Sequence, residues 1–223
     1  MSKKKLFALS VVVIMIAILS FSSLAWFTDA DDVTNKFMVA GSDDADPDDI
    51  FSVDVWEDLD GDGKKDTDAG GTYQDILPGD VLDKEPHVVN TGSYDQYIRV
   101  SVTISHAKVW GELAKQGLDV TSVFVGFDAT KWDRIWNNIS ENPNAEEIVY
   151  AMYYKEILKP GEEIVVFTDV KIPESLTQEL AAAFEGSFTI NVKADAVQTQ
   201  NVGVDTTNDV CDAYEAFKYI EAN

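Results

Sequence analysis

The segment Tyr97-Ile-Arg-Val-Ser-Val-Thr-Ile104 alternates apolar and polar side chains at every second position. In an extended strand, one face then carries Ile98, Val100, Val102 and Ile104. Alternation of this kind is typical of antiparallel sheets that have one face on a core and the other face in water. The segment therefore predicts a β-strand that packs on a hydrophobic core.

The same alternation recurs along the chain. In Ser187–Val197 the residues expected to face inward are Phe188, Ile190, Val192, Ala194 and Ala196. Phe51–Val55 is a shorter example of the pattern. Four more segments are strand candidates: His87–Val89, Ser122–Phe127, Ile148–Tyr154 and Glu163–Ile172. Strands of this number and length predict an all-β core.

Helical spacing is less frequent. We expect helices over Lys108–Gln116, Lys131–Ile139, Pro173–Phe184 and Asp209–Glu221, and we assign their aromatic side chains to core packing. Pro173 suits the first turn of its helix. The predicted fold is mainly β, a jelly-roll-like antiparallel β-sandwich with short helices inserted in its connections and a C-terminal helix.

Two turns of similar sequence separate predicted strands. Ile76-Leu-Pro-Gly-Asp80 is echoed by Ile157-Leu-Lys-Pro-Gly-Glu162, and each precedes a predicted strand. Proline followed by glycine favours a tight turn. The echo is a weak internal repeat, which would mark equivalent strands in two facing sheets.

The N-terminus has the three parts of a secretory signal peptide. Met1–Lys5 is cationic, Leu6–Leu19 carries no charge, and the small residues Ser23 and Ala25 flank Leu24. We predict cleavage by a signal peptidase between Ala25 and Trp26. The alternative is an uncleaved membrane anchor, because the uncharged stretch continues as far as Phe27. Either interpretation places the rest of the chain outside the cytoplasm, and cleavage limits membrane contact to the signal peptide.

We divide the chain into four parts: a signal peptide at 1–25, an N-terminal segment and acidic linker at 26–49, a β-sandwich domain at 50–200, and a linker and helix at 201–223.

The formal net charge of the chain is −23. Cleavage of residues 1–25 would remove three lysines and no acidic residue, and the net charge would become −26. Such a surface repels nucleic acid and anionic lipid, so neither is an expected partner.

Cys211 is the only cysteine, which excludes an internal disulfide. We expect it to be buried as a small hydrophobic residue, with pairing to a second chain as the alternative.

The most specific chemical motif is the acidic loop 58–68. Asp58, Asp60, Asp62 and Asp66 occupy positions 1, 3, 5 and 9 of a calcium loop, Gly63 supplies a sharp turn, and the Lys64 carbonyl falls at position 7. Position 12 is Ala69 instead of glutamate, and Asp68 is the nearest substitute. The spacing resembles the calcium loops of dockerin-like and thrombospondin-type repeats more than an EF-hand. The alternative is a solvated acidic hairpin tip. A second acidic run within 43–49 lacks ligand spacing and is interpreted as a solvated linker.

No motif predicts catalysis. The chain has no Gly-x-Ser-x-Gly elbow, and its two histidines, His87 and His106, form no His-Glu-x-x-His pair. Both lie at or beside predicted strands, where we expect surface or edge positions. We therefore predict a protein that is not an enzyme.

Several short motifs carry a family resemblance through their order. They are Ala25-Trp-Phe-Thr-Asp29, Asn35-Lys-Phe-Met-Val-Ala-Gly41, Leu77-Pro-Gly-Asp80, Val89-Asn-Thr-Gly92 with Tyr97-Ile-Arg-Val100, Leu158-Lys-Pro-Gly-Glu162 and Val192-Lys-Ala-Asp-Ala-Val-Gln198. In this order the chain resembles the TasA/camelysin family of exported biofilm-matrix fibre proteins, which have a SipW-type signal peptide. The resemblance runs from residue 1 to about residue 200, and it does not include the calcium-like loop or the final helix.

The resemblance implies a secreted jelly-roll subunit, located in the extracellular matrix or at the cell surface. It implies polymerisation with other copies, and with other matrix subunits, by donor-strand exchange of the mature N-terminus. The apolar residues of that donor strand would be Phe27, Phe37 and Val39. The alternative is an ordinary first strand that packs on its own domain. Two rival functions stay open: a camelysin-like cell-surface metallo-endopeptidase and a monomeric calcium-dependent surface adhesin.

Overall fold

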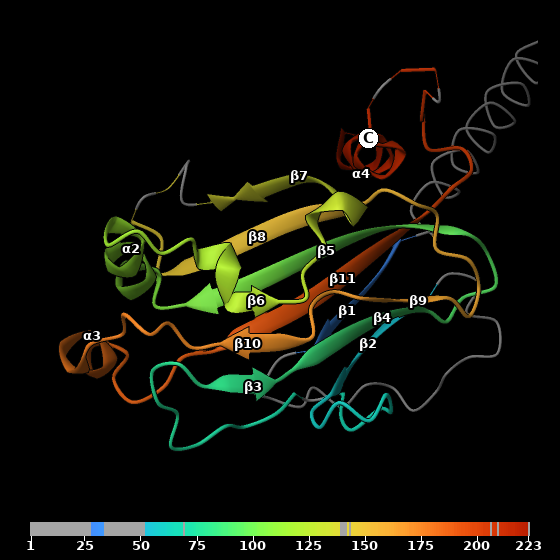
Figure 1. Cartoon of the computed structure of the whole chain (residues 1–223). Coiled ribbons are helices and arrows are strands. Elements are labelled where there is room, and N and C mark those ends of the chain that lie inside the picture. The colour runs from blue at the N-terminus through green and yellow to red at the C-terminus, as the bar shows by residue number, and fades with distance from the viewer. Residues whose placement is uncertain are drawn as a thin grey trace, which may run out of the picture.

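The alternating segments form two layers of antiparallel strands in the computed structural model (Figure 1). The structure describes residues 28–33, 52–68, 70–138, 142, 144–205, 207–208 and 210–222. The predicted signal peptide, its cleavage site at Ala25 and Trp26, the donor residues Phe27, Phe37 and Val39, and the acidic linker lie outside these residues.

The first layer is a five-stranded sheet in the order β1-β11-β5-β8-β7. The strands are β1 (Thr28–Val33), β11 (Ile190–Gln198), β5 (Gln96–Ser105), β8 (Glu147–Tyr154) and β7 (Trp132–Asn137). The register places Val192 and Tyr150 on either side of Val102. All three side chains are buried, as period-2 alternation requires of one face of a sheet.

The second layer combines two three-stranded sheets, β2-β4-β9 and β3-β10-β6. Their bounds are β2 (Val53–Asp58), β4 (Glu85–Asn90), β9 (Glu163–Val165), β3 (Val81–Asp83), β10 (Asp169–Lys171) and β6 (Phe124–Val125). Lys84 connects β3 to β4, and residues 166–168 connect β9 to β10. Backbone hydrogen bonds cross this junction from Lys84 N to Thr168 O (3.4 Å) and from Val166 N to Pro86 O (3.0 Å). The two sheets therefore form one bent layer.

Short helices fill the connections. They are α2 (Ala107–Lys115), α3 (Gln178–Ala183) and the 3₁₀-helices η1 (Val120–Val123) and η2 (Ala129–Lys131). Trp110 and Leu113 of α2 are fully buried in the core between the layers. Figure 1 shows α2 and α3 at the same end of the sandwich. In the part of the chain that the structure describes, no helix has the length and apolar composition needed to cross a membrane.

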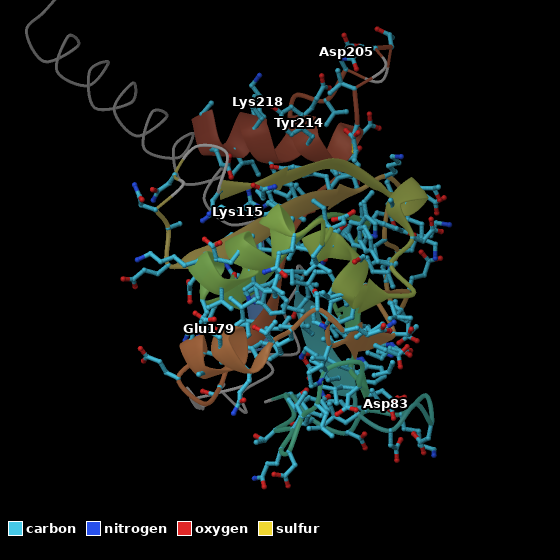
Figure 2. The ribbon with its side chains drawn as sticks, turned by 60° about the vertical axis from the view of Figure 1, so that its left-hand side comes forward. Asp83, Lys115, Glu179, Asp205, Tyr214 and Lys218 are labelled. Carbon is cyan, nitrogen blue, oxygen red and sulfur yellow. The ribbon has the colours of Figure 1, made fainter. Side chains whose placement is uncertain are left out.

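The last helix, α4 (Asp212–Ala222), packs on the outer face of the five-stranded sheet. A second hydrophobic cluster joins Ala216 and Phe217 of α4 to Tyr97 and Val197 of the sheet. Figure 2 shows α4, with Lys218 pointing away from the sheet, at the opposite end of the molecule from Asp83 in β3. The helix therefore covers apolar side chains that would otherwise be exposed on that face.

Arg99 fastens α4 to the sheet. Its guanidinium donates to Asp195 Oδ2 from Nη2 (2.9 Å) and Nε (3.1 Å), pairs with Glu221 of α4, and lies 4.5 Å from the centre of the Phe217 ring. Burial lowers the pKa of Arg99, but the hydrogen bonds from Glu221 and Asp195 outweigh burial and raise the pKa above its ordinary value.

The predicted mainly β antiparallel sandwich, with helices in its connections and at its C-terminus, is confirmed.

The predicted helix over Lys131–Ile139 is wrong, because Trp132–Asn137 is strand β7. A register shift between Asp133 and Trp136 marks a bulge, which interrupts period-2 alternation and imitates helical spacing. The helix predicted over Pro173–Phe184 is shorter than expected. Pro173 lies in a preceding turn, and the helix begins after Thr177, whose side chain caps it.

Candidate metal site

The acidic loop leaves the end of β2 and closes back on it. Glu57 N donates to Thr67 O (2.9 Å), and Asp66 N donates to Glu57 O (3.0 Å). Gly61 and Gly63 have φ values of 72° and 77°, which a residue with a side chain rarely adopts. Two glycines and a backbone clamp therefore set the path of the loop.

Asp58 organises the inside of the loop. Its Oδ1 accepts from the amides of Asp60 (3.0 Å) and Gly61 (2.7 Å), and its Oδ2 accepts from the amide of Gly63 (2.6 Å). Burial raises the pKa of Asp58, but the hydrogen bonds from these backbone amides and that of Asp62 outweigh burial. The pKa therefore lies below its ordinary value of 3.8, and Asp58 is ionised at neutral pH.

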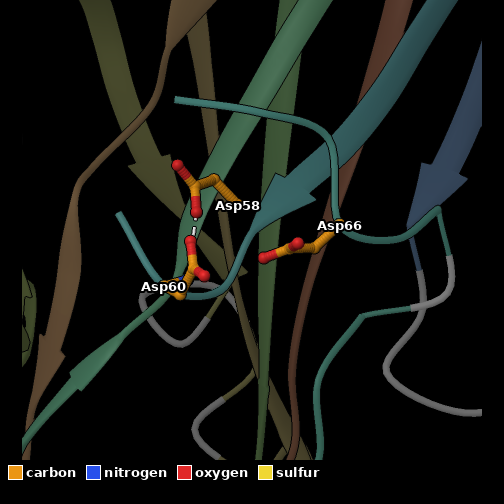
Figure 3. A group of neighbouring side chains, drawn as sticks. All are labelled: Asp58, Asp60 and Asp66. Carbon is orange, nitrogen blue, oxygen red and sulfur yellow. Dashed lines mark hydrogen bonds between the residues drawn. The ribbon is translucent and has the colours of Figure 1, made fainter. Parts of the chain in front are cut away.

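Three of the predicted ligands meet. One carboxylate oxygen from each of Asp58, Asp60 and Asp66 lies within 4.8 Å of the other two (Figure 3). Asp58 is buried, whereas Asp60 and Asp66 are exposed. The amide of Leu59 holds Asp66 in place by donating to its Oδ2 (2.8 Å). Such an arrangement can supply hard oxygen ligands to a divalent cation from one side.

The other predicted ligands lie outside this group. Asp62 pairs with the ammonium of Lys64, whose side chain is largely exposed. Asp68 pairs with Lys65, which also contacts Asp54 (3.2 Å). Burial lowers the pKa of Lys65, and its hydrogen bonds and charge interactions with Asp68 and Asp54 outweigh that effect and raise it. Two lysines of the same loop thus neutralise the two remaining aspartates.

A buried ion pair adjoins the loop and was not anticipated from the sequence. Glu57 and Lys84 are both fully buried, and the Lys84 ammonium donates to Glu57 Oε1. Glu57 Oε2 is buried without a hydrogen-bond partner. The sequence signal was the alternation of β2, which places Glu57 on the same face as the core residues Val53 and Val55.

The expected surface position of His87 is wrong. Its ring is buried and stacks on Trp56, with ring centres 3.8 Å apart. Its nitrogens lie 3.0 Å from Glu85 and 3.7 Å from Glu163, without hydrogen-bond geometry. Among the residues placed by the structure, Asp58, Asp60 and Asp66 are the one group of three acidic, His or Cys side chains close enough to share an ion, so neither histidine joins such a group.

Comparisons of this chain with protein-family models, with curated proteins and with solved structures found no match.

Proposed function

We propose that this chain is an exported structural subunit that polymerises into extracellular fibres, with its first strand joining neighbouring copies. The observation that carries the proposal is the position of β1. It is the edge strand of the five-stranded sheet, and among the described strands it pairs with β11 alone. Strand addition at a sheet edge depends on main-chain hydrogen bonds, which the same strand of another copy can make equally well.

The N-terminal sequence supports the same function. β1 begins at Thr28, three residues after the predicted cleavage site at Ala25. Cleavage would leave β1 beside a free chain end, and a terminal strand can exchange between copies without pulling an internal segment out of the fold. The order of short motifs that resembles the TasA/camelysin family of matrix proteins points the same way.

Electron microscopy of the exported form, residues 26–223, tests the proposal. We expect fibres from this protein and none after deletion of residues 26–40. Proline substitutions at Ala30 and Asp31 refine the test, because neighbouring amides of a strand point to opposite sides. We expect one of these two variants to assemble much more poorly than the other, since one loses a hydrogen bond to β11.

The rival functions give different results. Persistent monomers that bind a surface only with calcium would identify an adhesin. Monomers that cleave casein, with activity lost on chelation, would identify a metallo-endopeptidase. Either result would overturn the fibre proposal, as would normal fibres from the deletion variant.

The proposal includes calcium at Asp58, Asp60 and Asp66, whose charges repel one another unless a cation lies between them. We expect saturating calcium to raise the melting temperature of chelator-treated protein by about 5 °C or more. Asp60→Asn should remove most of that rise. Asp62→Asn is the matched control, because Asp62 is in the same loop but outside the group, and it should keep the rise. An equal loss in both variants, or no effect of calcium on the unmodified chain, would contradict the site.

A further inference from the structure

A cavity of about 140 Å³ lies between the two layers, where β11 begins. Its walls include Tyr73, Leu82, Lys84, Val170, Phe188 and Ile190. The two titratable side chains of the wall already have partners, because Tyr73 donates to the Asp83 carbonyl and Lys84 pairs with Glu57. The space therefore suits an apolar group more than a charged one.

The size of the cavity suits one aromatic ring. A cavity of about 150 Å³ lined by aliphatic and aromatic side chains is large enough to hold benzene. Phe188 already belongs to an aromatic group here, since its ring centre lies 5.4 Å from that of Trp110 and 5.1 Å from that of Phe184. A further ring would add edge or stacked contacts of the same kind.

The register of β1 on β11 shows which residue would arrive there. Val33 pairs with Val192, and each step forward along β1 is one step back along β11. A strand that continues past Val33 in this register therefore brings its position 37 opposite Phe188. Directly opposite residues of antiparallel strands share a face. Phe188 lies two residues before β11 and packs, partly buried, against the core to which Ile190 and Val192 belong. Position 37 of the sequence is phenylalanine.

We infer that this cavity is the anchoring pocket for Phe37 of a second copy, which would enter alongside β11 as the continuation of a donated β1. The inference rests on the proposed fibre function and specifies the contact that holds two subunits together. Main-chain hydrogen bonds supply the pairing, and the phenylalanine in its pocket fixes the register, since a slip of one residue would turn it to the outer face.

Cysteine cross-linking between two differently labelled copies tests the contact, in a background with Cys211→Ala. One copy carries Lys36→Cys and the other Thr189→Cys, positions that the register places opposite each other. Thr189 is half-buried at the edge of the cavity. A thiol cross-linker should then join the two copies as they assemble. The mismatched control pairs Lys36→Cys with Lys193→Cys, which the same register places four residues further along β11, and it should give little product.

Fibre growth gives a second measurement. Phe37→Ala should slow growth about tenfold because it removes an aromatic anchor from a pocket, and Phe37→Leu should keep most of the rate. Fibres that form without the Lys36–Thr189 cross-link, or that grow normally with Phe37→Ala, would overturn the pocket and leave the fibre function standing. An absence of fibres from the unmodified chain would instead reject the proposed function itself.

Discussion

Glu57 and Lys84 place two opposite charges inside the sandwich, at the bend where β3 continues into β4. Burial lowers the pKa of Lys84, and the charge of Glu57 restores it only in part. Removing two charges from water costs free energy that their attraction seldom returns in full. The pair therefore contributes more to the geometry of the bend than to net stability.

A double-mutant cycle tests this interpretation. We expect Lys84→Met to lower the free energy of unfolding by about 3–5 kcal/mol, because it leaves a buried carboxylate without its partner. Combining it with Glu57→Met should recover most of that loss. Urea unfolding of the two single variants and the double variant measures the coupling. A double variant that is as unstable as the sum of the single variants would contradict the interpretation.

Asp58 makes the stability of the chain sensitive to acid. Its pKa is lower in the folded chain than its ordinary value of 3.8, so its stabilising effect is complete at neutral pH and is lost as the pH falls through 3.8 and below. In chelator, we expect Asp58→Asn to cost about 2 kcal/mol at pH 7 because charge-assisted hydrogen bonds are lost, and to cost much less near pH 3. Urea unfolding at both pH values measures this difference. Asp62→Asn is the control, and an equal cost for Asp58→Asn at both pH values would refute the prediction.

At the scale of elements, α4 depends on Arg99 for its attachment. Arg99→Ala removes two ion pairs and a cation–π contact, and we expect it to destabilise the docked helix by about 1–2 kcal/mol. Hydrogen exchange of the α4 amides should then become faster while that of β5 changes little. Lys218→Ala is the matched control, because Lys218 is exposed on the far side of the same helix. Unchanged exchange in α4 would show that the apolar cluster holds the helix without Arg99.

The strands were predictable wherever one face meets the core without interruption. In β5, buried and half-buried positions alternate from Ile98 to Ser105, and the apolar positions of the strand are all buried. The predicted secondary structure was wrong where the strands depart from regular pairing. The bulge in β7 imitated a helix, and the single strand predicted over Glu163–Ile172 is bent into β9 and β10. Bulges and bends arise from contacts with distant strands, which local periodicity does not report.

The echoed turns had a different outcome from the one expected. Leu77–Asp80 and Lys159–Glu162 have the same construction, since in each the acidic side chain accepts from the amide three residues earlier. They introduce β3 and β9, which belong to one bent layer and not to two facing sheets. A turn determines how a strand begins, whereas the layer that the strand joins is decided by its pairing partners.

The candidate site was predictable in part for a related reason. The spacing of the loop identified Asp58, Asp60 and Asp66, which the backbone clamp at Glu57 brings together. It gave no sign that Lys64 and Lys65 would pair with Asp62 and Asp68. Those ion pairs depend on the directions of side chains within a folded loop. The burial of Lys84 depends on the bend between β3 and β4, which the sequence pattern does not predict.

At the scale of the whole molecule, charge should control how fast copies associate. The chain carries a net charge of −23, or −26 without the predicted signal peptide, so two copies repel each other at low ionic strength. If the chain forms fibres as proposed, we expect their rate of growth to rise severalfold between about 10 and 150 mM salt, as the Debye length falls from about 30 to 8 Å. Light scattering at a fixed protein concentration measures the rate. Sodium and potassium chloride should act alike, and growth that slows with added salt would mean that attraction between unlike patches drives assembly.

Helix α4 also bears on the shape of any assembly. It lies across the outer face of the five-stranded sheet and covers its apolar cluster. A second sheet cannot laminate onto the part of a face that a helix already occupies, so a filament grown through strand exchange would not thicken on that side. The helices would then form a regular ridge along that side of the filament. That ridge would repeat once for every subunit along the polymer.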